Sequence, residues 1–281
     1  MVGALLGAVV ALGASAQIPA PAYGGDGKQP VTLSSATVAD PHQLVGKAIA
    51  YSPRLKALTS FPENLVFKVT WGVFEVGEAT LEVKELVEFN GRPAYHVVSR
   101  ANSNPWCDAF YKVRDVNESW IDAETLDSLG YSKKLREGHF FRDEWVLYDQ
   151  QRHTFLSKRV GRDGNFSYAA GTTTAHVQDI LSAMYFVRSH ALTPGKDVVL
   201  DVNTRENWPL IVHVAKSERV RVPAGRFQAD LVEPALRHEG LFIQKGRKLQ
   251  IWLADDAKKT PIMMKVEVFF GHISARLWKM L

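Results

Sequence analysis

Hydrophobic and polar residues alternate with a period of two over much of this chain. Leu65, Phe67, Val69 and Trp71 are separated by more polar residues, and residues 79–83 repeat the pattern. Because successive side chains of a strand point to opposite faces, this period predicts strands with one buried face.

Turn residues divide the rest of the chain into short strand candidates. Asn90-Gly91 and Asp163-Gly164 predict tight hairpins, because these residue types tolerate positive φ. The further candidates are residues 94–100, 110–120, 130–135, 140–149, 154–160, 166–169, 197–203, 209–215, 219–222, 227–233, 249–253, 264–270 and 273–277. About a dozen short strands predict a mainly β fold, either a large curved antiparallel sheet or a partly open β-barrel.

One segment breaks this pattern. Val177, Ile180, Leu181, Met184 and Val187 recur at the spacing of one face of an α-helix. We predict a single packed helix over about residues 176–190, which Thr173 or Thr174 would cap and Pro194-Gly195 would stop.

The N-terminal segment predicts export. Residues 2–12 are apolar and uncharged, and Ala14-Ser15-Ala16 has the small-x-small pattern of a signal-peptidase site. We therefore interpret residues 1–16 as a signal peptide, although no basic residue precedes the apolar run. A buried N-terminal helix is the alternative. A periplasmic or secreted location follows, without a lipid anchor, because no Cys follows the apolar run.

The remainder divides into a lead and one domain. Residues 17–59 are expected to be flexible, with a possible short helix around His42–Ala50, and residues 60–281 to form a single antiparallel β domain. No later segment is apolar for 18 residues, so no transmembrane helix is expected after cleavage. The formal charge of +4 suits peripheral contact with an anionic envelope but is too small to indicate nucleic-acid binding.

Few residues form a pattern that is typical of a catalytic or cofactor-binding site. No phosphate loop, nucleophile elbow or zinc motif occurs, and the nine histidines are scattered, so neither a cofactor nor a metal is expected. Four carboxylates, Asp108, Asp115, Asp122 and Asp255, are the candidates for an acid/base pair of a polysaccharide hydrolase. The alternative is that Asp122 flanks a turn and Asp115 lies on a solvated strand face.

Aromatic and basic residues suggest binding. The candidates for lining a ligand cavity are Trp71, Trp106, Tyr111, Trp120 and Trp252, with core packing as the alternative. Two basic groups, Lys133-Lys134 with Arg136 and residues 245–248, could meet acidic headgroups or polysaccharide, or could be solvated edges. The lone Cys107 is interpreted as a small buried hydrophobe.

Four motifs in order resemble one family. They are Gly72–Ala79, Gln178–Arg188, Val222–Phe227 and Ile251–Asp256 with the following Pro261-Ile262. Together they resemble the domain-of-unknown-function 3108 family over about residues 60–281. The resemblance implies an exported bacterial protein and brings no established activity.

The resemblance marks three residues as structural. Asp179 and Arg188 would pair with each other or anchor the helix to the sheet, and Gly225 would supply a turn conformation. By architecture alone, the expected fold is also similar to periplasmic lipoprotein carriers, an analogy that cannot establish function.

Three hypotheses follow for function. The first is non-catalytic binding of an apolar or amphipathic envelope ligand, a lipid or a glycan, in a concave face of the sheet. The second is the polysaccharide hydrolase, and the third is a structural envelope component.

Overall fold

A computed structural model describes residues 39–52, 55, 58, 61–236, 248–268 and 270–281. The predicted signal peptide and most of the basic group at 245–248 lie outside these residues. Within them, fifteen strands form one antiparallel sheet. The mainly β prediction is therefore confirmed.

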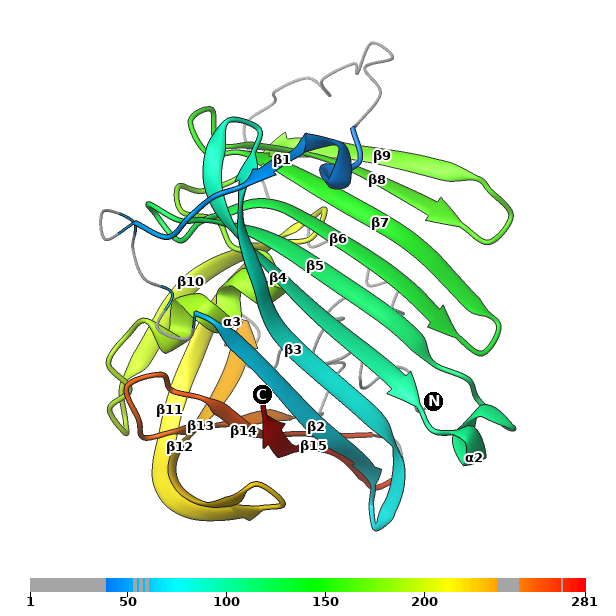
Figure 1. Cartoon of the computed structure of the whole chain (residues 1–281), viewed down its shortest axis with the longest axis vertical. Coiled ribbons are helices and arrows are strands. Elements are labelled where there is room, and N and C mark those ends of the chain that lie inside the picture. Colours follow the sequence, from blue (N-terminus) through cyan, green and yellow to red (C-terminus); the bar gives the residue numbers. More distant parts are fainter. Residues whose placement is uncertain (1–38, 53–54, 56–57, 59–60, 237–247, 269) are drawn as a thin grey trace.

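The sheet is built from long hairpins (Figure 1). Its strands are β1 (Val45–Ala48), β2 (Glu63–Trp71), β3 (Phe74–Phe89), β4 (Arg92–Ser103), β5 (Arg114–Asp122), β6 (Ser128–Glu137), β7 (Phe140–Asp149), β8 (Thr154–Gly161), β9 (Phe166–Thr172), β10 (Asp197–Asn203), β11 (Asn207–Val222), β12 (Gly225–Leu236), β13 (Leu249–Ala254), β14 (Pro261–Glu267) and β15 (His272–Met280). The helices are the 3₁₀ turn η1 (Pro41–Leu44), the short α2 (Pro105–Asp108) and α3 (Ile180–Arg188).

The order of strands is β10 to β15, then β2 to β9, with β1 added beside β3. Because neighbours are antiparallel, the turns gather at two ends of the sheet. The "α2 end" holds α2 and the β2–β3, β6–β7, β8–β9 and β14–β15 turns. The "α3 end" holds the β3–β4, β5–β6, β7–β8 and β13–β14 turns.

Several turns have the predicted geometry. Asn90 and Gly91 have φ of 48° and 81°, and Gly164 has φ of 78°, so both predicted hairpins form with positive φ. Gly225, at the β11–β12 turn, has φ of 146°, a conformation that favours glycine.

The sheet curves, but its two edge strands do not hydrogen-bond to each other to close it. β9 and β10 are its two edges and do not pair. Side chains that follow β10 reach β9 instead: Arg205 Nη1, in the β10–β11 turn, donates to the Ser167 carbonyl at 3.3 Å, and Asn207 Nδ2, at the start of β11, donates to the Thr172 carbonyl at 2.8 Å. The result is a partly open barrel.

The main core fills the concave face. Interior residues of almost every strand pack there with α3. A smaller apolar cluster covers the outer face, where Phe89 and Trp120 stack below Leu44 and Val45 of the N-terminal segment. The prediction that Trp120 lines the concave face is therefore wrong. Trp120 and Ile121 are successive residues of β5, so they point to opposite faces of the sheet, and both are buried because each face is covered there.

Two local predictions also need correction. The helix is shorter than predicted, and Asp179, not Thr173 or Thr174, caps it. It ends at Ser189, before Pro194. The proposed helix at His42–Ala50 is instead η1 followed by β1, which pairs with β3. The sheet thus takes in residues that we assigned to a flexible lead.

Candidate functional site

The N-terminus of α3 is anchored by a buried carboxylate. Asp179 accepts hydrogen bonds from Leu181 N at 2.7 Å, Ser182 N at 3.0 Å and Ser119 Oγ at 2.6 Å, and from Ser128 Oγ. Burial raises the pKa of Asp179, and these donors oppose the shift. Because Ser119 and Ser128 belong to β5 and β6, the cap ties the helix to the sheet.

The C-terminus of α3 is anchored by a buried ion pair. Arg188 donates from Nη2 and Nη1 to the carboxylate of Glu63 at 2.6 and 3.0 Å, and Tyr185 Oη donates to the same group at 2.9 Å. Arg188 Nε reaches the Lys258 carbonyl at 3.1 Å. Asp179 and Arg188 therefore do not pair with each other; they anchor opposite ends of the helix.

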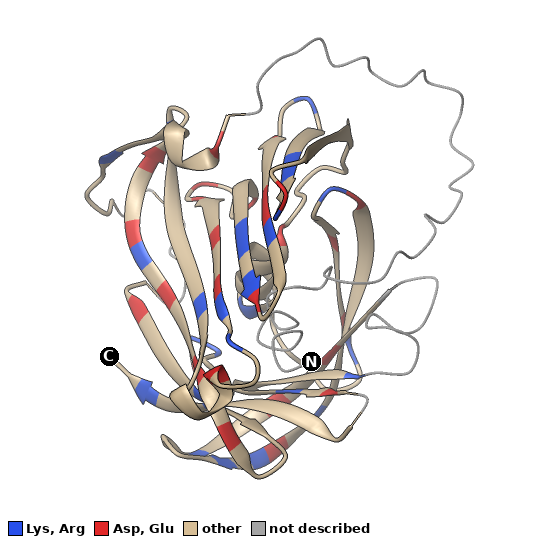
Figure 2. Ribbon diagram, turned by 90° about the vertical axis from the view of Figure 1, so that its right-hand side faces the viewer, with Lys and Arg blue, Asp and Glu red and all other residues tan. Residues whose placement is uncertain are grey.

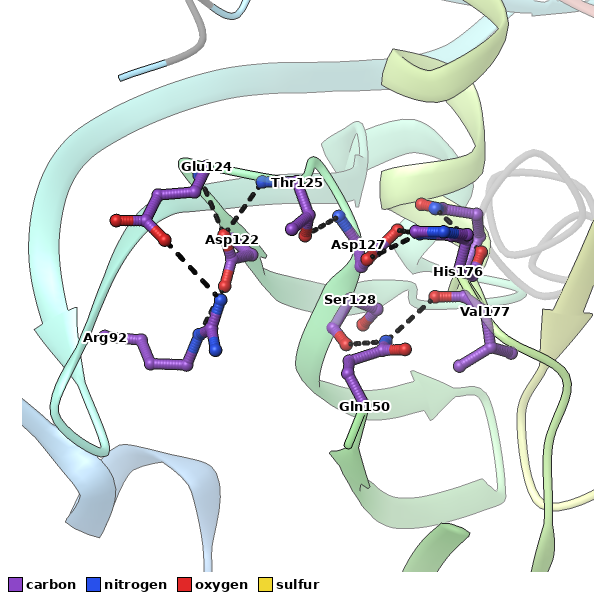
Figure 3. A network of polar contacts seen from close by, with 10 residues as sticks. Arg92, Asp122, Glu124, Thr125, Asp127, Ser128, Gln150, His176 and Val177 are labelled. Carbon is purple, nitrogen blue, oxygen red and sulfur yellow. Dashed lines mark hydrogen bonds and ion pairs between the residues drawn. The ribbon is translucent and has the colours of Figure 1, made fainter. Parts of the chain in front are cut away.

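The chain before α3 is held at the same end of the sheet (Figure 3). Gln150 Nε2 donates to the Ser128 carbonyl at 2.6 Å and to the Val177 carbonyl at 3.2 Å. His176 lies 3.0 Å from Asp127, on the β5–β6 turn. The helix α3 is thus held at both of its ends and lies across the concave face at the α3 end of the sheet.

An apolar cavity of about 50 Å³ lies between α3 and the sheet. Its side chains come from α3 and from β2, β3, β4, β14 and β15, and include Phe67, Val69, Ala79, Leu81, Ser99, Ile180, Leu181, Met184, Met264, Ile273 and Ala275. This cavity is the apolar part of the candidate site.

A row of residues in register leads away from this cavity across the sheet. Leu81 pairs with Ser99, Ser99 with Asn117, and Asn117 with Lys133. The row continues through Glu144 and Arg159. Neighbouring strands are about 4.8 Å apart, so Lys133 lies about 10 Å from Ser99. The concave face therefore changes from apolar to charged along one row.

The charged end of the row is a basic cluster around one acid. Glu144, with no exposed surface, lies 3.5 Å from Lys133 Nζ and 2.5 Å from Arg159 Nε. Burial would raise the pKa of Glu144, but Lys133 and Arg159 lower it below its ordinary value. Figure 2 shows basic and acidic residues on neighbouring strands.

Two further guanidinium groups complete this cluster. Burial and the nearby Arg159 lower the pKa of both Arg142 and Arg205. The Arg142 guanidinium lies over the Phe140 ring, 4.8 Å from its centroid, and makes no ion pair or hydrogen bond with the residues described. We call Lys133, Arg142, Glu144, Arg159 and Arg205 the concave basic cluster. Its net charge is positive.

The sequence hypothesis missed the role of Lys133. Both interpretations, contact with headgroups or polysaccharide and a solvated edge, place this side chain at the surface, but Lys133 is 1% exposed. The signal was present, because Lys133 has the same strand parity as Tyr131 and Leu135, which are both buried. Lys134 is exposed, and Arg136 pairs with Asp143 at 2.7 Å.

A carboxyl pair lies near the α2 end. Asp115 on β5 and Glu137 on β6 are neighbouring buried carboxyl groups, and burial raises their pKa values to about 6 and about 8. Asp115 is only 1% exposed, which corrects the interpretation of a solvated strand face.

The other carboxylate candidates do not join this pair. Asp108 pairs with Arg114, on the α2 segment. Asp122 pairs with Arg92 at 2.6 Å and accepts backbone hydrogen bonds of its turn, as the alternative interpretation held (Figure 3). Asp255 is exposed in the β13–β14 turn, at the α3 end. The four candidates thus divide between opposite ends of the sheet.

The remaining aromatic candidates do not lie together in one site. Trp71, Trp106 and Tyr111 lie at the α2 end, where Trp71 Nε1 donates to the Phe270 carbonyl at 2.8 Å. Trp252 is buried, with Nε1 donating to Glu218 at 2.9 Å. None of these residues lines the apolar cavity.

Other site types find little support in the described part of the chain. There, no three His, Cys, Asp or Glu side chains gather as metal ligands would. None of the described helices has the length and apolar character needed to span a bilayer. Cys107 is buried and unpaired.

Comparison with solved structures supports the fold. A β-barrel-like protein of domain of unknown function DUF1849 from Brucella abortus is similar, with a TM-score of 0.52 and 12% identity over 81% of this chain and 98% of that one. At that identity the likeness concerns the fold alone.

Two further structures show weaker likeness. A protein with a YmcC-like fold from Bacteroides fragilis has a TM-score of 0.28 and 9% identity over 78% of this chain and 95% of its own. A protein from Parabacteroides distasonis has a TM-score of 0.27 and 8% identity over 84% of this chain and all of its own.

Sequence comparison identifies the family. No curated protein matches the chain. The family model described as "Protein of unknown function (DUF3108)" matches residues 66–277, which include α3 and most of the sheet, though not β1. The chain therefore belongs to this family.

Proposed function

We propose that this protein binds, without catalysis, an amphipathic molecule that has an apolar tail and an anionic head. The observation that carries the proposal is the row in register from the apolar cavity to the concave basic cluster. A tail in the cavity and a head on the cluster would span adjacent strands of one concave face.

The apolar part is small but adaptable. A cavity of about 50 Å³ holds less than two waters' share of liquid volume, so a longer tail must displace side chains. Met184 and Met264 line it from opposite sides, and unbranched methionine side chains rearrange readily. The anchored ends of α3 would keep the helix in place while these side chains move.

The charged part favours an anion. Four basic groups surround the single Glu144, and the ionised forms of Lys133, Arg142 and Arg205 are disfavoured by burial. A bound anion would relieve this repulsion through charge-assisted hydrogen bonds. Arg142, which has no such partner among the described residues, is the residue best placed to gain one.

Export and an envelope location are part of the proposal. They are supported by the apolar run and Ala14-Ser15-Ala16 at the N-terminus. A ligand from a membrane or from the envelope would then be present where the protein works.

Binding of dansyl-undecanoic acid tests the proposal, because this probe combines an apolar chain with a carboxylate. Ala79→Leu should fill the cavity and Arg142→Gln should remove a head contact. Arg142→Gln is expected to weaken binding about tenfold or more, since a charge-assisted hydrogen bond contributes about 1.5–3 kcal/mol. Ala79→Leu is expected to weaken binding by a similar factor, because the larger side chain occupies the space that the tail needs.

The controls are Val199→Leu and Arg226→Gln, at exposed positions away from both parts. Absence of binding by the parent protein, or equal effects of the controls, would contradict the proposal. Native mass spectrometry of the protein purified from its own compartment would show a retained ligand as added mass.

A further inference from the structure

Exposed aromatic side chains are concentrated at one end of the sheet. Among the described residues, every largely exposed phenylalanine and tryptophan lies in a turn or strand start at the α2 end. They are Phe74 (63% exposed), Trp106 (58%), Phe110 (79%), Phe166 (60%) and Phe270 (62%). These residues come from four separate connections, which the antiparallel register brings to the same end (Figure 1).

Three of these rings form one protruding cluster. Trp106 stacks on Phe74 with ring centroids 6.4 Å apart, and meets Phe110 edge-on at 5.9 Å. Val73, at the tip of the β2–β3 hairpin, is 89% exposed beside them. An apolar group this exposed is unfavourable in water and indicates a partner.

A basic pocket lies at the same end. Its volume is about 250 Å³, and its lining includes Lys112, Arg114, Arg136, His139, Phe140, Phe141 and Arg162. Arg114 and Arg136 are paired with Asp108 and Asp143. Lys112 and Arg162 have no carboxylate partner among the residues that the structure describes, so the pocket keeps a positive charge.

We propose that the α2 end is a docking surface for an anionic phospholipid bilayer. Tryptophan and phenylalanine side chains insert at the boundary between headgroups and acyl chains, while lysine and arginine attract anionic headgroups. At the α2 end, the exposed rings lie next to Lys112 and Arg162. An anionic bilayer offers both an apolar interior for the rings and anionic headgroups for these cations.

The arrangement fits a bilayer better than a glycan. A sugar stacks on the free face of an aromatic ring, whereas the Trp106 ring is already stacked on Phe74 and covered at its edge by Phe110. The rings instead form an apolar wedge. The helix α3 lies at the opposite end of the sheet, so docking at the α2 end leaves the helix and its anchoring contacts undisturbed.

The proposal does not depend on a ligand in the concave face. It adds the place where the protein would meet a membrane. Loss of docking with unchanged binding of dansyl-undecanoic acid would separate the two proposals.

Vesicle co-sedimentation of the full chain tests docking. The protein's binding constant is measured for phosphatidylcholine vesicles and for vesicles of phosphatidylethanolamine with phosphatidylglycerol. The readout is the increase in this binding constant from the first kind of vesicle to the second. Every variant carries the same N-terminal apolar segment, so differences between variants report on the α2 end. Each basic residue near an anionic surface contributes about 1 kcal/mol, so Lys112→Glu with Arg162→Glu should reduce the increase at least about 30-fold.

The matched control reverses two exposed arginines of the β11–β12 hairpin, outside the aromatic cluster and the basic pocket, Arg221→Glu with Arg226→Glu. This control should keep the increase. Equal loss in both double variants, no increase for the parent protein, or binding to a soluble anionic polysaccharide in place of vesicles would overturn the proposal.

Insertion of the aromatic cluster needs its own readout. Lipids brominated on the acyl chain should quench tryptophan fluorescence of the parent protein. Trp106→Phe should remove most of this quenching while it keeps binding, because an aromatic ring remains to insert. Trp106→Ser should weaken binding itself. Unchanged quenching in Trp106→Phe would refute insertion at this point.

Discussion

The carboxyl pair of Asp115 and Glu137 makes a sharp prediction about stability and pH. The pKa of Glu137 is raised from 4.5 to about 8 in the folded protein, mainly by burial and by the neighbouring Asp115. Between these two pH values the unfolded chain releases the proton and the folded protein keeps it. The free energy of unfolding therefore falls as the pH rises through this range, and its contribution from Glu137 is lost by about pH 8.

The magnitude follows from the size of the shift. A difference of about 3.5 pKa units corresponds to at most about 5 kcal/mol, at 1.36 kcal/mol per unit. Glu137→Gln replaces the titrating group by an amide that stays neutral and can donate to Asp115. The variant should therefore lose much less stability than the parent protein between pH 5 and pH 8.

Urea unfolding at a series of pH values measures this difference. Glu267→Gln, at an exposed carboxylate on the same end of the sheet, is the matched control and should follow the parent protein. If the parent protein and Glu137→Gln gave parallel curves from pH 5 to pH 8, Glu137 would not keep its proton in the folded protein over this range. The reasoning about this buried pair would then be refuted.

Two further predictions concern packing. Glu63→Gln leaves Arg188 as a buried charge without a carboxylate, which should destabilise the protein by about 3–5 kcal/mol in urea unfolding; a cost below about 1 kcal/mol would show that α3 is held by other contacts. Gly77→Ala places a Cβ 2.2 Å from the Asn102 carbonyl oxygen, so backbone must move. A cost of about 1–3 kcal/mol is expected in the same assay, and an unchanged midpoint would contradict the close approach of β3 and β4.

Local signals in the sequence anticipated the fold class well. Period-two alternation and the Asn90-Gly91 and Asp163-Gly164 turns predicted strands and hairpins, because side-chain alternation and positive φ are local properties. The helix was predicted from its apolar stripe, but its start was misplaced. We predicted Thr173 or Thr174 as the cap, whereas Asp179 caps the helix together with Ser182 and also accepts hydrogen bonds from Ser119 and Ser128 of the sheet.

The candidate site was much less predictable. Asp115 has an ordinary solvated appearance in the sequence, and only the β5–β6 pairing places Glu137 beside it. Likewise, strand parity predicts that Lys133 faces inward, but Glu144 and Arg159 become its neighbours only through the registers of β6, β7 and β8. Register between strands is set by packing across the whole sheet.

The sequence by itself therefore determined the β-rich class, the single substantial helix and the family, because each depends on local periodicity or on motifs in order. The tertiary structure decided which face each aromatic ring occupies, which carboxyl groups lie side by side and where the basic residues gather. Those properties arise between strands distant in the chain, through register, bulges and burial, and no local pattern encodes them.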